Sequence, residues 1–251
     1  MNMLESKVAL VTGGGQGVGQ GIAFALANEG AMVAVAGRTR ATLEQTCDEI
    51  RRRGGTALAV ECDVMNQADI NRCVAEVVEA FGGLNILVNN AHIVPLGSIL
   101  EVTDEAFMLG IDSGPMATLR MMRACHPHLK GDGAVINLAS SAAVRWDASG
   151  YGHYAATKEA IRALSRGAAC EWGVDGIRVN VIAPHALSPG LRGWIENNPH
   201  EAQVFFNSIP LRRVGDCESD IGRTVAFLVS DNARYLTGAT IPLDGGQAYW
   251  G

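Results

Sequence analysis

The stretch KVALVTGGGQGVGQGIA, residues 7–23, decides the fold. It begins with a run of apolar and β-branched residues, which is typical of a strand buried on both faces. Gly13, Gly17 and Gly19 follow, where they allow a tight turn into a helix and a close backbone approach to a ligand. The N-terminus of such a helix attracts phosphate through its free N–H groups and its dipole. The stretch therefore predicts a dinucleotide site at Gly13, Gln16, Gly17, Val18 and Gly19.

The same alternation of strand and helix patterns continues along the chain. Further strands are predicted over residues 32–37, 56–61, 86–90, 134–139 and 177–183. Helices are predicted over 42–53, 66–81, 103–129 and 154–171, with a kink in the third at Gly114 and Pro115. Nearly continuous apolar strands indicate a parallel sheet with helices on both faces. We expect one doubly wound (Rossmann) α/β domain over residues 1–251.

One segment interrupts this rhythm, at about residues 185–214. It contains Pro189, Gly190, Gly193, Pro199 and Pro210. A regular helix or strand in the core does not tolerate so many prolines and glycines. Its aromatic residues nevertheless need apolar contacts. We expect the segment to be a lid over the site; the alternative is a surface excursion that packs against a neighbouring subunit.

Composition excludes several classes of function. A net charge of -6 with intermixed signs provides no basic stripe for nucleic acid, so a small molecule is the expected partner. No apolar run reaches the ~18 residues of a membrane helix. The N-terminus lacks a signal-peptide pattern, and a cytoplasmic protein is expected. Six cysteines without a CxxC pair, and His126 and His128 without a third ligand, predict reduced thiols and no metal site.

The end of the second predicted strand indicates which nicotinamide cofactor binds. An NAD-selective protein usually places an acid there, whereas this chain has Gly37 followed by Arg38. A guanidinium suits a 2'-phosphate, so NADP(H) is preferred and NAD(H) remains possible. The alternative is that Arg38 is a solvated loop cation. Asp63 is placed to contact the adenine, unless it only caps a helix. The expected adenosine contacts are Arg38, Thr39, Asp63 and Val64.

Tyr154 and Lys158 are four residues apart, so on a helix they share one face. A phenol normally titrates near pH ~10 and needs a nearby cation before it can exchange protons at neutral pH. Lys158 is that cation, and the pair predicts acid/base chemistry. The alternative is a partly exposed tyrosine beside a solvated lysine.

Taken together, the strings TGGGQGVG, CDV, NNA, a serine before YxxxK, IRVN and LTGATIPLDGG resemble the short-chain dehydrogenase/reductase family. The resemblance spans essentially the whole chain. It implies a seven-stranded parallel sheet and hydride transfer between a nicotinamide and a carbonyl or secondary alcohol. It also implies a homotetramer or homodimer, formed through the helices over residues 103–129 and 154–171.

The resemblance also implies roles for individual residues. Tyr154 is the general acid in reduction and the base in oxidation. Lys158 lowers the pKa of Tyr154 and binds the nicotinamide ribose. Ser140 holds the substrate oxygen, with Ser141 as a close alternative. The expected contacts with the adenosine ribose and the nicotinamide end are Asn90, Ala91, Pro184 and Leu187.

Three positions depart from the family pattern. Gly114 stands where the family usually has a relay asparagine, and His92 and His185 replace glycines. Both imidazoles are expected near the nicotinamide end, as substrate contacts, as auxiliary proton carriers or as tolerated substitutions. The candidate substrate residues are Ser141, His92, Trp146, His185 and Trp194.

Three functions are compatible with this pattern. The leading hypothesis is an NADP(H)-dependent carbonyl reductase or alcohol dehydrogenase. The alternatives are a cofactor-binding regulatory or assembly protein with reduced turnover, motivated by the three departures, and a 3-oxoacyl-thioester reductase.

Overall fold

A computed structural model describes residues 2–146 and 150–250 of the chain. Its centre is a seven-stranded parallel sheet in the order β3-β2-β1-β4-β5-β6-β7. The strands are β1 Val8–Thr12, β2 Met32–Gly37, β3 Thr56–Glu61, β4 Ile86–Asn89, β5 Gly133–Leu138, β6 Ile177–Pro184 and β7 Thr240–Leu243. The predicted doubly wound parallel sheet is confirmed. The seventh strand, which only the family resemblance implied, is present as well.

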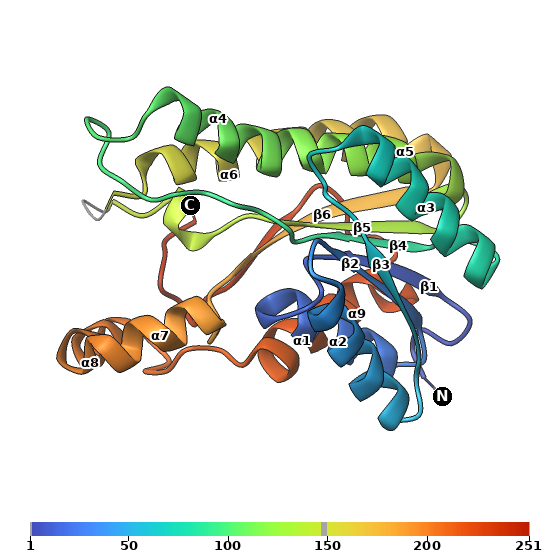
Figure 1. The fold of residues 1–251 in the computed structure, drawn as a ribbon, viewed down its shortest axis with the longest axis horizontal. Coiled ribbons are helices and arrows are strands. Elements are labelled where there is room, and N and C mark those ends of the chain that lie inside the picture. The colour runs from blue at the N-terminus through green and yellow to red at the C-terminus, as the bar shows by residue number, and fades with distance from the viewer. Residues whose placement is uncertain (1, 147–149, 251) are drawn as a thin grey trace.

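Helices cover both faces of the sheet (Figure 1). The α-helices are α1 Gly17–Asn28, α2 Arg40–Arg52, α3 Gln67–Phe81, α4 Asp104–Ile111, α5 Ala117–Leu129, α6 Gly152–Trp172, α7 Pro189–Asn197, α8 Pro199–Ser208 and α9 Arg223–Val229. Figure 1 shows α3, α4, α5 and α6 on one face and α1, α2 and α9 on the other, with α7 and α8 projecting at one end. No helix among the described residues is long and apolar enough to cross a membrane.

The central strand β1 shows why both faces are covered. Ala9 and Val11 belong to one buried apolar cluster, and Val8 and Leu10 belong to the other. Successive side chains of a strand point to opposite faces, so an uninterrupted apolar run supplies two cores. Helices must then pack on each side to remove both surfaces from water.

The third predicted helix is interrupted where the sequence predicted a kink. A π turn over Asp112–Met116 separates α4 from α5 and contains Pro115. Proline has no N–H to continue the α-helical pattern. The backbone therefore takes a wider register, in which the N–H of Ala117 bonds to the carbonyl of Asp112, five residues back.

The segment over residues 185–214 is more regular than its prolines suggested. Pro189 and Pro199 are the first residues of α7 and α8, and Ser188 caps α7 by accepting a hydrogen bond from the N–H of Leu191. The first turn of a helix tolerates proline because the N–H there has no intrahelical partner. The prolines begin helices in this segment, whereas our interpretation treated them as breaks.

The topology brings the functional residues together. β1 has β2 on one side and β4 on the other, so the chain winds in opposite directions from this point. Crevices at the carboxyl ends of the strands form where the winding reverses. The glycine turn after β1 and the loops after β4, β5 and β6 all lie at that edge.

Candidate active site

The glycine turn has the backbone that the sequence predicted. Gly13 and Gly17 have positive φ angles of 65° and 57°. A Cβ on Gly19 would lie 2.4 Å from the carbonyl oxygen of Gly13, so only glycine fits there. No described side chain caps the N-terminus of α1 at Gln16, and the first turn carries no acid. These residues fit a pyrophosphate, which the uncapped N–H groups would hold.

Asn90 fixes this turn to the end of β4, a role that sequence reasoning missed. Its side-chain amide donates to the carbonyls of Thr12, at 2.9 Å, and Gly13, at 3.1 Å. The hydroxyl of Thr12 in turn accepts from the N–H groups of Asn90 and Ala91, at 3.0 and 3.1 Å. The reciprocal bonds hold the two loops as one unit.

The adenosine end is more open. Gly37 ends β2 in register with Glu61, and Arg38 is exposed just beyond it. Asp63 accepts a bond of 3.0 Å from the N–H of Met65. It does not cap the following helix, because the side chain of Asn66 does so. The alternative structural role of Asp63 as a helix cap is therefore wrong.

A cavity of about 1060 Å³ gathers most of the predicted site. The predicted residues that line it are Gly13, Gln16, Gly17, Val18, Asn90, Ala91, His92, Ser140, Ser141, Tyr154, Lys158, Pro184, His185 and Trp194. Those that do not line it are Gly19, Arg38, Thr39, Asp63, Val64, Trp146 and Leu187. Trp146 is fully exposed, at 103%. Gly19 packs inside the turn, so its contribution to the site is structural.

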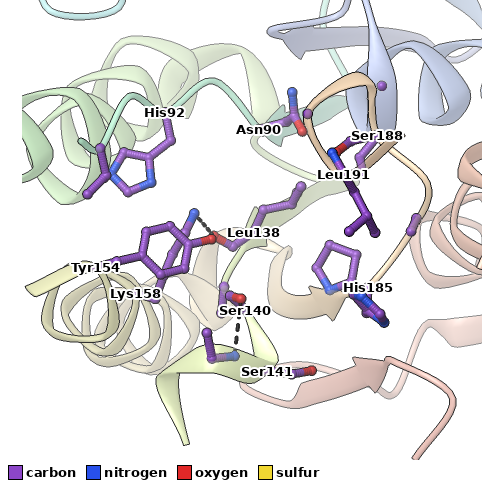
Figure 2. Close-up of a pocket in the computed structure, with 18 of the residues that line it drawn as sticks. Asn90, His92, Leu138, Ser140, Ser141, Tyr154, Lys158, His185, Ser188 and Leu191 are labelled. Atoms are coloured by element: carbon purple, nitrogen blue, oxygen red, sulfur yellow. Dashed lines mark hydrogen bonds between the residues drawn. The ribbon is translucent and has the colours of Figure 1, made fainter. Parts of the chain in front are cut away.

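Lys158 reaches the cavity from α6 and is buried. Its ammonium donates to the carbonyl of Leu138 at 3.0 Å and lies 5.5 Å from the ring centroid of Tyr154 (Figure 2). Burial lowers the pKa of Lys158 to about 7, because a charge removed from water is destabilised. Near neutral pH this amine therefore exchanges a proton readily.

Tyr154 lies one helical turn earlier on α6 and faces the same cavity. Burial raises its pKa, while an interaction with the Ser140 hydroxyl acts in the opposite direction. We had expected Lys158 to lower this pKa. The structure instead shows two groups whose burial disfavours the charged form of each: burial raises the pKa of Tyr154 and lowers that of Lys158.

The two candidate serines differ in their partners. The hydroxyl of Ser141 donates to the Asp244 carboxylate at 2.5 Å and is buried. Ser140 accepts a bond of 3.2 Å from the N–H of Ala142, and its hydroxyl also interacts with Tyr154. The geometry favours Ser140 as the group that meets a substrate oxygen.

Aromatic rings form the opposite wall of the cavity. Phe205 contacts His185 and Trp194 edge to face, with ring centroids 5.2 and 5.9 Å apart. Burial lowers the pKa of His185, and its Nδ1 has no partner among the residues described. The imidazole is therefore neutral and part of an apolar wall.

Sequence reasoning missed several residues that line the cavity, among them Arg145, Tyr151 and Gln247. Tyr151 is three residues before Tyr154, and its ring meets the Tyr154 ring edge-on at 5.9 Å. Helical spacing could have indicated this contact. No sequence signal indicated Gln247, because it comes from the far end of the chain. Within the ranges 2–146 and 150–250, no cluster of three His, Cys, Asp or Glu residues could hold a metal.

Comparisons with known proteins agree with this geometry. Residues 13–248 match the family model described as enoyl-(acyl carrier protein) reductase. The 12alpha-hydroxysteroid dehydrogenase of Clostridium sp. is 39% identical, over 98% of each chain. The 3-oxoacyl-[acyl-carrier-protein] reductase FabG of Staphylococcus aureus is 34% identical, over 98% of this chain and 99% of the relative. A short-chain dehydrogenase from Burkholderia cenocepacia, solved with NADP, superposes with a TM-score of 0.91 at 31% identity, covering 98% of this chain and 99% of the other.

The chain belongs to the short-chain dehydrogenase/reductase family. It is an NAD(P)-dependent oxidoreductase, as the family's named dehydrogenases and reductases are.

Proposed function

We propose that this oxidoreductase uses NADP(H) to interconvert a ketone and a secondary alcohol. The observation that carries the proposal is the meeting of Ser140, Tyr154 and Lys158 in one cavity that the glycine turn also borders. The turn offers backbone donors to a pyrophosphate, while the three side chains offer proton transfer and hydrogen bonding to a substrate oxygen.

Each residue has a distinct task in this reaction. The bound nicotinamide supplies or accepts the hydride. Tyr154 gives its phenolic proton to the substrate oxygen in reduction and takes it back in oxidation. Ser140 donates a hydrogen bond to that oxygen as charge develops on it. Lys158, with a pKa near neutrality, restores the proton of Tyr154 and holds the ribose.

The preference for NADP(H) rests on the end of β2. Gly37 has no side chain to contact a ribose hydroxyl, and the exposed Arg38 can pair with a 2'-phosphate, next to Thr39. The Burkholderia structure with NADP supports the same choice. NAD(H) would bind without the guanidinium contact, and therefore less tightly.

The proposed substrate is an apolar to amphipathic ketone. Trp194, His185 and Phe205 provide a largely aromatic wall, which suits a bulky hydrocarbon skeleton. The name of the Clostridium relative makes hydroxysteroids the first class to test. We also propose that α7 and α8 act as the lid, because both supply residues to the cavity wall.

Reduction of a 3-oxoacyl thioester is the second candidate, favoured by the name of the Staphylococcus relative. A regulatory or assembly role with little turnover is a third possibility. A cytoplasmic homotetramer or homodimer remains the proposed form of the protein.

The decisive experiment is a substrate panel of ketosteroids, simple ketones and 3-oxoacyl thioesters, assayed with NADPH and with NADH. We expect ketone reduction that is faster with NADPH. Tyr154→Phe should lower kcat by about 10²- to 10⁴-fold, as loss of a general acid does. Tyr235→Phe is the matched control, because Tyr235 is fully exposed. A parent protein that binds NADPH but reduces nothing in the panel would favour the regulatory role.

A further inference from the structure

His92 lies in the loop after β4, which is fastened to the π turn between α4 and α5. The N–H of Ile93 donates to the Ser113 hydroxyl at 3.2 Å. That hydroxyl lies 2.8 Å from the carbonyl of Ile93 and 2.7 Å from that of Leu109. These hydrogen bonds tie the backbone beside His92 to the end of α4 and to the π turn.

The imidazole of His92 has a defined tautomer. Its Nε2 lies 3.0 Å from the carbonyl oxygen of Gly110. A carbonyl can only accept, so Nε2 carries the proton and Nδ1 has a lone pair. Burial and the nearby positive charge of Lys158 together lower the pKa of His92 to about 3. The ring is therefore neutral throughout the physiological range.

Gly114 leaves the space that this ring occupies. A Cβ on Gly114 would lie 2.5 Å from Nε2 of His92, closer than real Cβ contacts, and 3.0 Å from Cδ2. The ring thus takes the room in which another residue at position 114 would place its side chain. Two of the departures from the family pattern, His92 and Gly114, are complementary in shape.

The ring also touches the proton donor. His92 stacks on Tyr154 with ring centroids 5.9 Å apart and planes 20° apart, while Tyr151 meets Tyr154 edge-on at 5.9 Å. Figure 2 shows His92 beside Tyr154 and Lys158 in the cavity wall. Among the described residues, Lys158 donates one hydrogen bond, to the carbonyl of Leu138, although an ammonium has three protons.

We propose that His92 is a positioning residue for the Tyr154–Lys158 pair: a neutral imidazole, locked as the Nε2–H tautomer by Gly110, that supports the phenol ring and offers Nδ1 as an acceptor on the cavity side. The shape complementarity with Gly114 and the stacking on Tyr154 carry this inference. It rests on the proposed function, because the phenol it positions is the proposed acid.

The same geometry excludes a role as an auxiliary proton carrier. A carrier must take a proton on one nitrogen and release one from the other, which for His92 means breaking the bond to Gly110. A bond to a buried carbonyl is costly to lose without a replacement. His92 therefore acts by position and by accepting, and does not shuttle protons.

The first test separates the ring shape from its nitrogens. His92→Phe keeps a flat ring against Tyr154 but has neither donor nor acceptor. We expect kcat to fall by about 10- to 100-fold, the scale of a misplaced catalytic group. The Kd for NADPH should stay within about threefold, below the tenfold that 1.4 kcal/mol produces. The exposed His128→Phe is the control. Parental kcat in His92→Phe would overturn the proposal.

The second test is a double-mutant cycle. Gly114→Ala should lower kcat because its new Cβ displaces the imidazole. In a His92→Gly background, where no ring is present to displace, the same substitution should have almost no further effect. Such non-additivity is the signature of two residues in contact. Additive effects of the two substitutions would contradict the inference.

A spectroscopic measurement decides the tautomer without any assay of turnover. The ¹⁵N resonances of His92 should show a protonated Nε2 and an unprotonated Nδ1, unchanged between about pH 5 and pH 8, where an ordinary histidine titrates. A protonated Nδ1 or a titration in this window would refute the inference. If the parent protein reduced no carbonyl, the proposed function would fail. The ¹⁵N measurement would still test the tautomer of His92 on its own.

Discussion

The glycine turn after β1 and the π turn between α4 and α5 both require glycine, but a different neighbour imposes the requirement at each. A Cβ on Gly19 would strike the backbone oxygen of Gly13, whereas a Cβ on Gly114 would strike the His92 side chain. A backbone cannot yield, and a side chain can. The first turn is therefore constrained mainly by its own main chain, and the second by one particular pair of residues.

The comparison separates two functions of the site. The glycine turn would present backbone N–H groups to the cofactor, so the groups that bind there belong to the main chain. The π turn supports the groups that transfer the proton. A substitution that disturbs the glycine turn should abolish cofactor binding. A substitution that disturbs the π turn should leave cofactor binding intact and slow the reaction.

The largest effect is expected for Gly19→Ala. The clash with the Gly13 carbonyl should cost about 1–3 kcal/mol of unfolding free energy, or more, as overpacking does. The displaced turn should weaken NADPH binding at least about 100-fold, equivalent to ~2.7 kcal/mol. Calorimetric titration and urea unfolding measure both quantities. Tight NADPH binding by this variant would show that the turn tolerates a side chain.

A smaller and different effect is expected for Gly114→Ala. The unfolding free energy should fall by about 1–2 kcal/mol, because the imidazole can move aside and only its contacts are lost. The Kd for NADPH should change by less than about threefold. Calorimetric titration and urea unfolding again measure the two quantities. If cofactor binding were lost as in Gly19→Ala, the division between the two turns would be wrong.

A third prediction concerns Lys158 on the proton-transfer side. Its folded pKa of about 7 lies below the ordinary value of 10.5, so above pH 7 the unfolded chain binds the proton that the folded chain has released. This group's contribution to stability therefore rises with pH, by up to about 1.4 kcal/mol per pH unit.

Lys158→Met removes that titration. Relative to the parent, the variant should be more stable at pH 7 by about 1–3 kcal/mol, as replacement of a buried charge by an apolar group often is. The advantage should shrink by up to about 2 kcal/mol by pH 9. Urea unfolding at pH 7, 8 and 9 measures it. A constant difference across this range would mean that Lys158 keeps its ordinary pKa.

The smallest effect is expected for Gly173→Ala, the control for both turns. Gly173 has φ -57° and nothing within 4 Å of an added Cβ. Alanine should raise the unfolding free energy by about 0.5–1 kcal/mol through its better helix propensity. NADPH affinity and kcat should match those of the parent. A loss of either would show that glycines outside the two turns also serve the site.

Much of the fold could be predicted from local pattern. The apolar runs of β1 to β6 and the turn at Gly13 and Gly17 are short-range signals, because strand burial and positive φ act within a few residues. The α7–α8 segment was harder to predict. Pro189 and Pro199 mark breaks or helix starts equally well in sequence, and only the resulting helices show which applies.

The candidate site was predicted less evenly. Tyr154 and Lys158 were found from their spacing on one helix. The shift in the pKa of Tyr154 could not be predicted from the sequence. Burial raises this pKa, and burial depends on everything packed around α6. The sequence already preferred Ser140 to Ser141, but the structural reason involves a distant residue, since Asp244 engages the Ser141 hydroxyl.

The sequence by itself determined the parallel sheet, the glycine turn and the spacing of the tyrosine and lysine, because each depends on neighbours along the chain. Only the tertiary structure decided that Asn90 braces the turn, that Lys158 is buried deeply enough to lose its charge near neutral pH, and that His92 fills the space beside Gly114. Those outcomes depend on contacts between segments far apart in the chain, and burial and contact distance exist only once the segments are packed together.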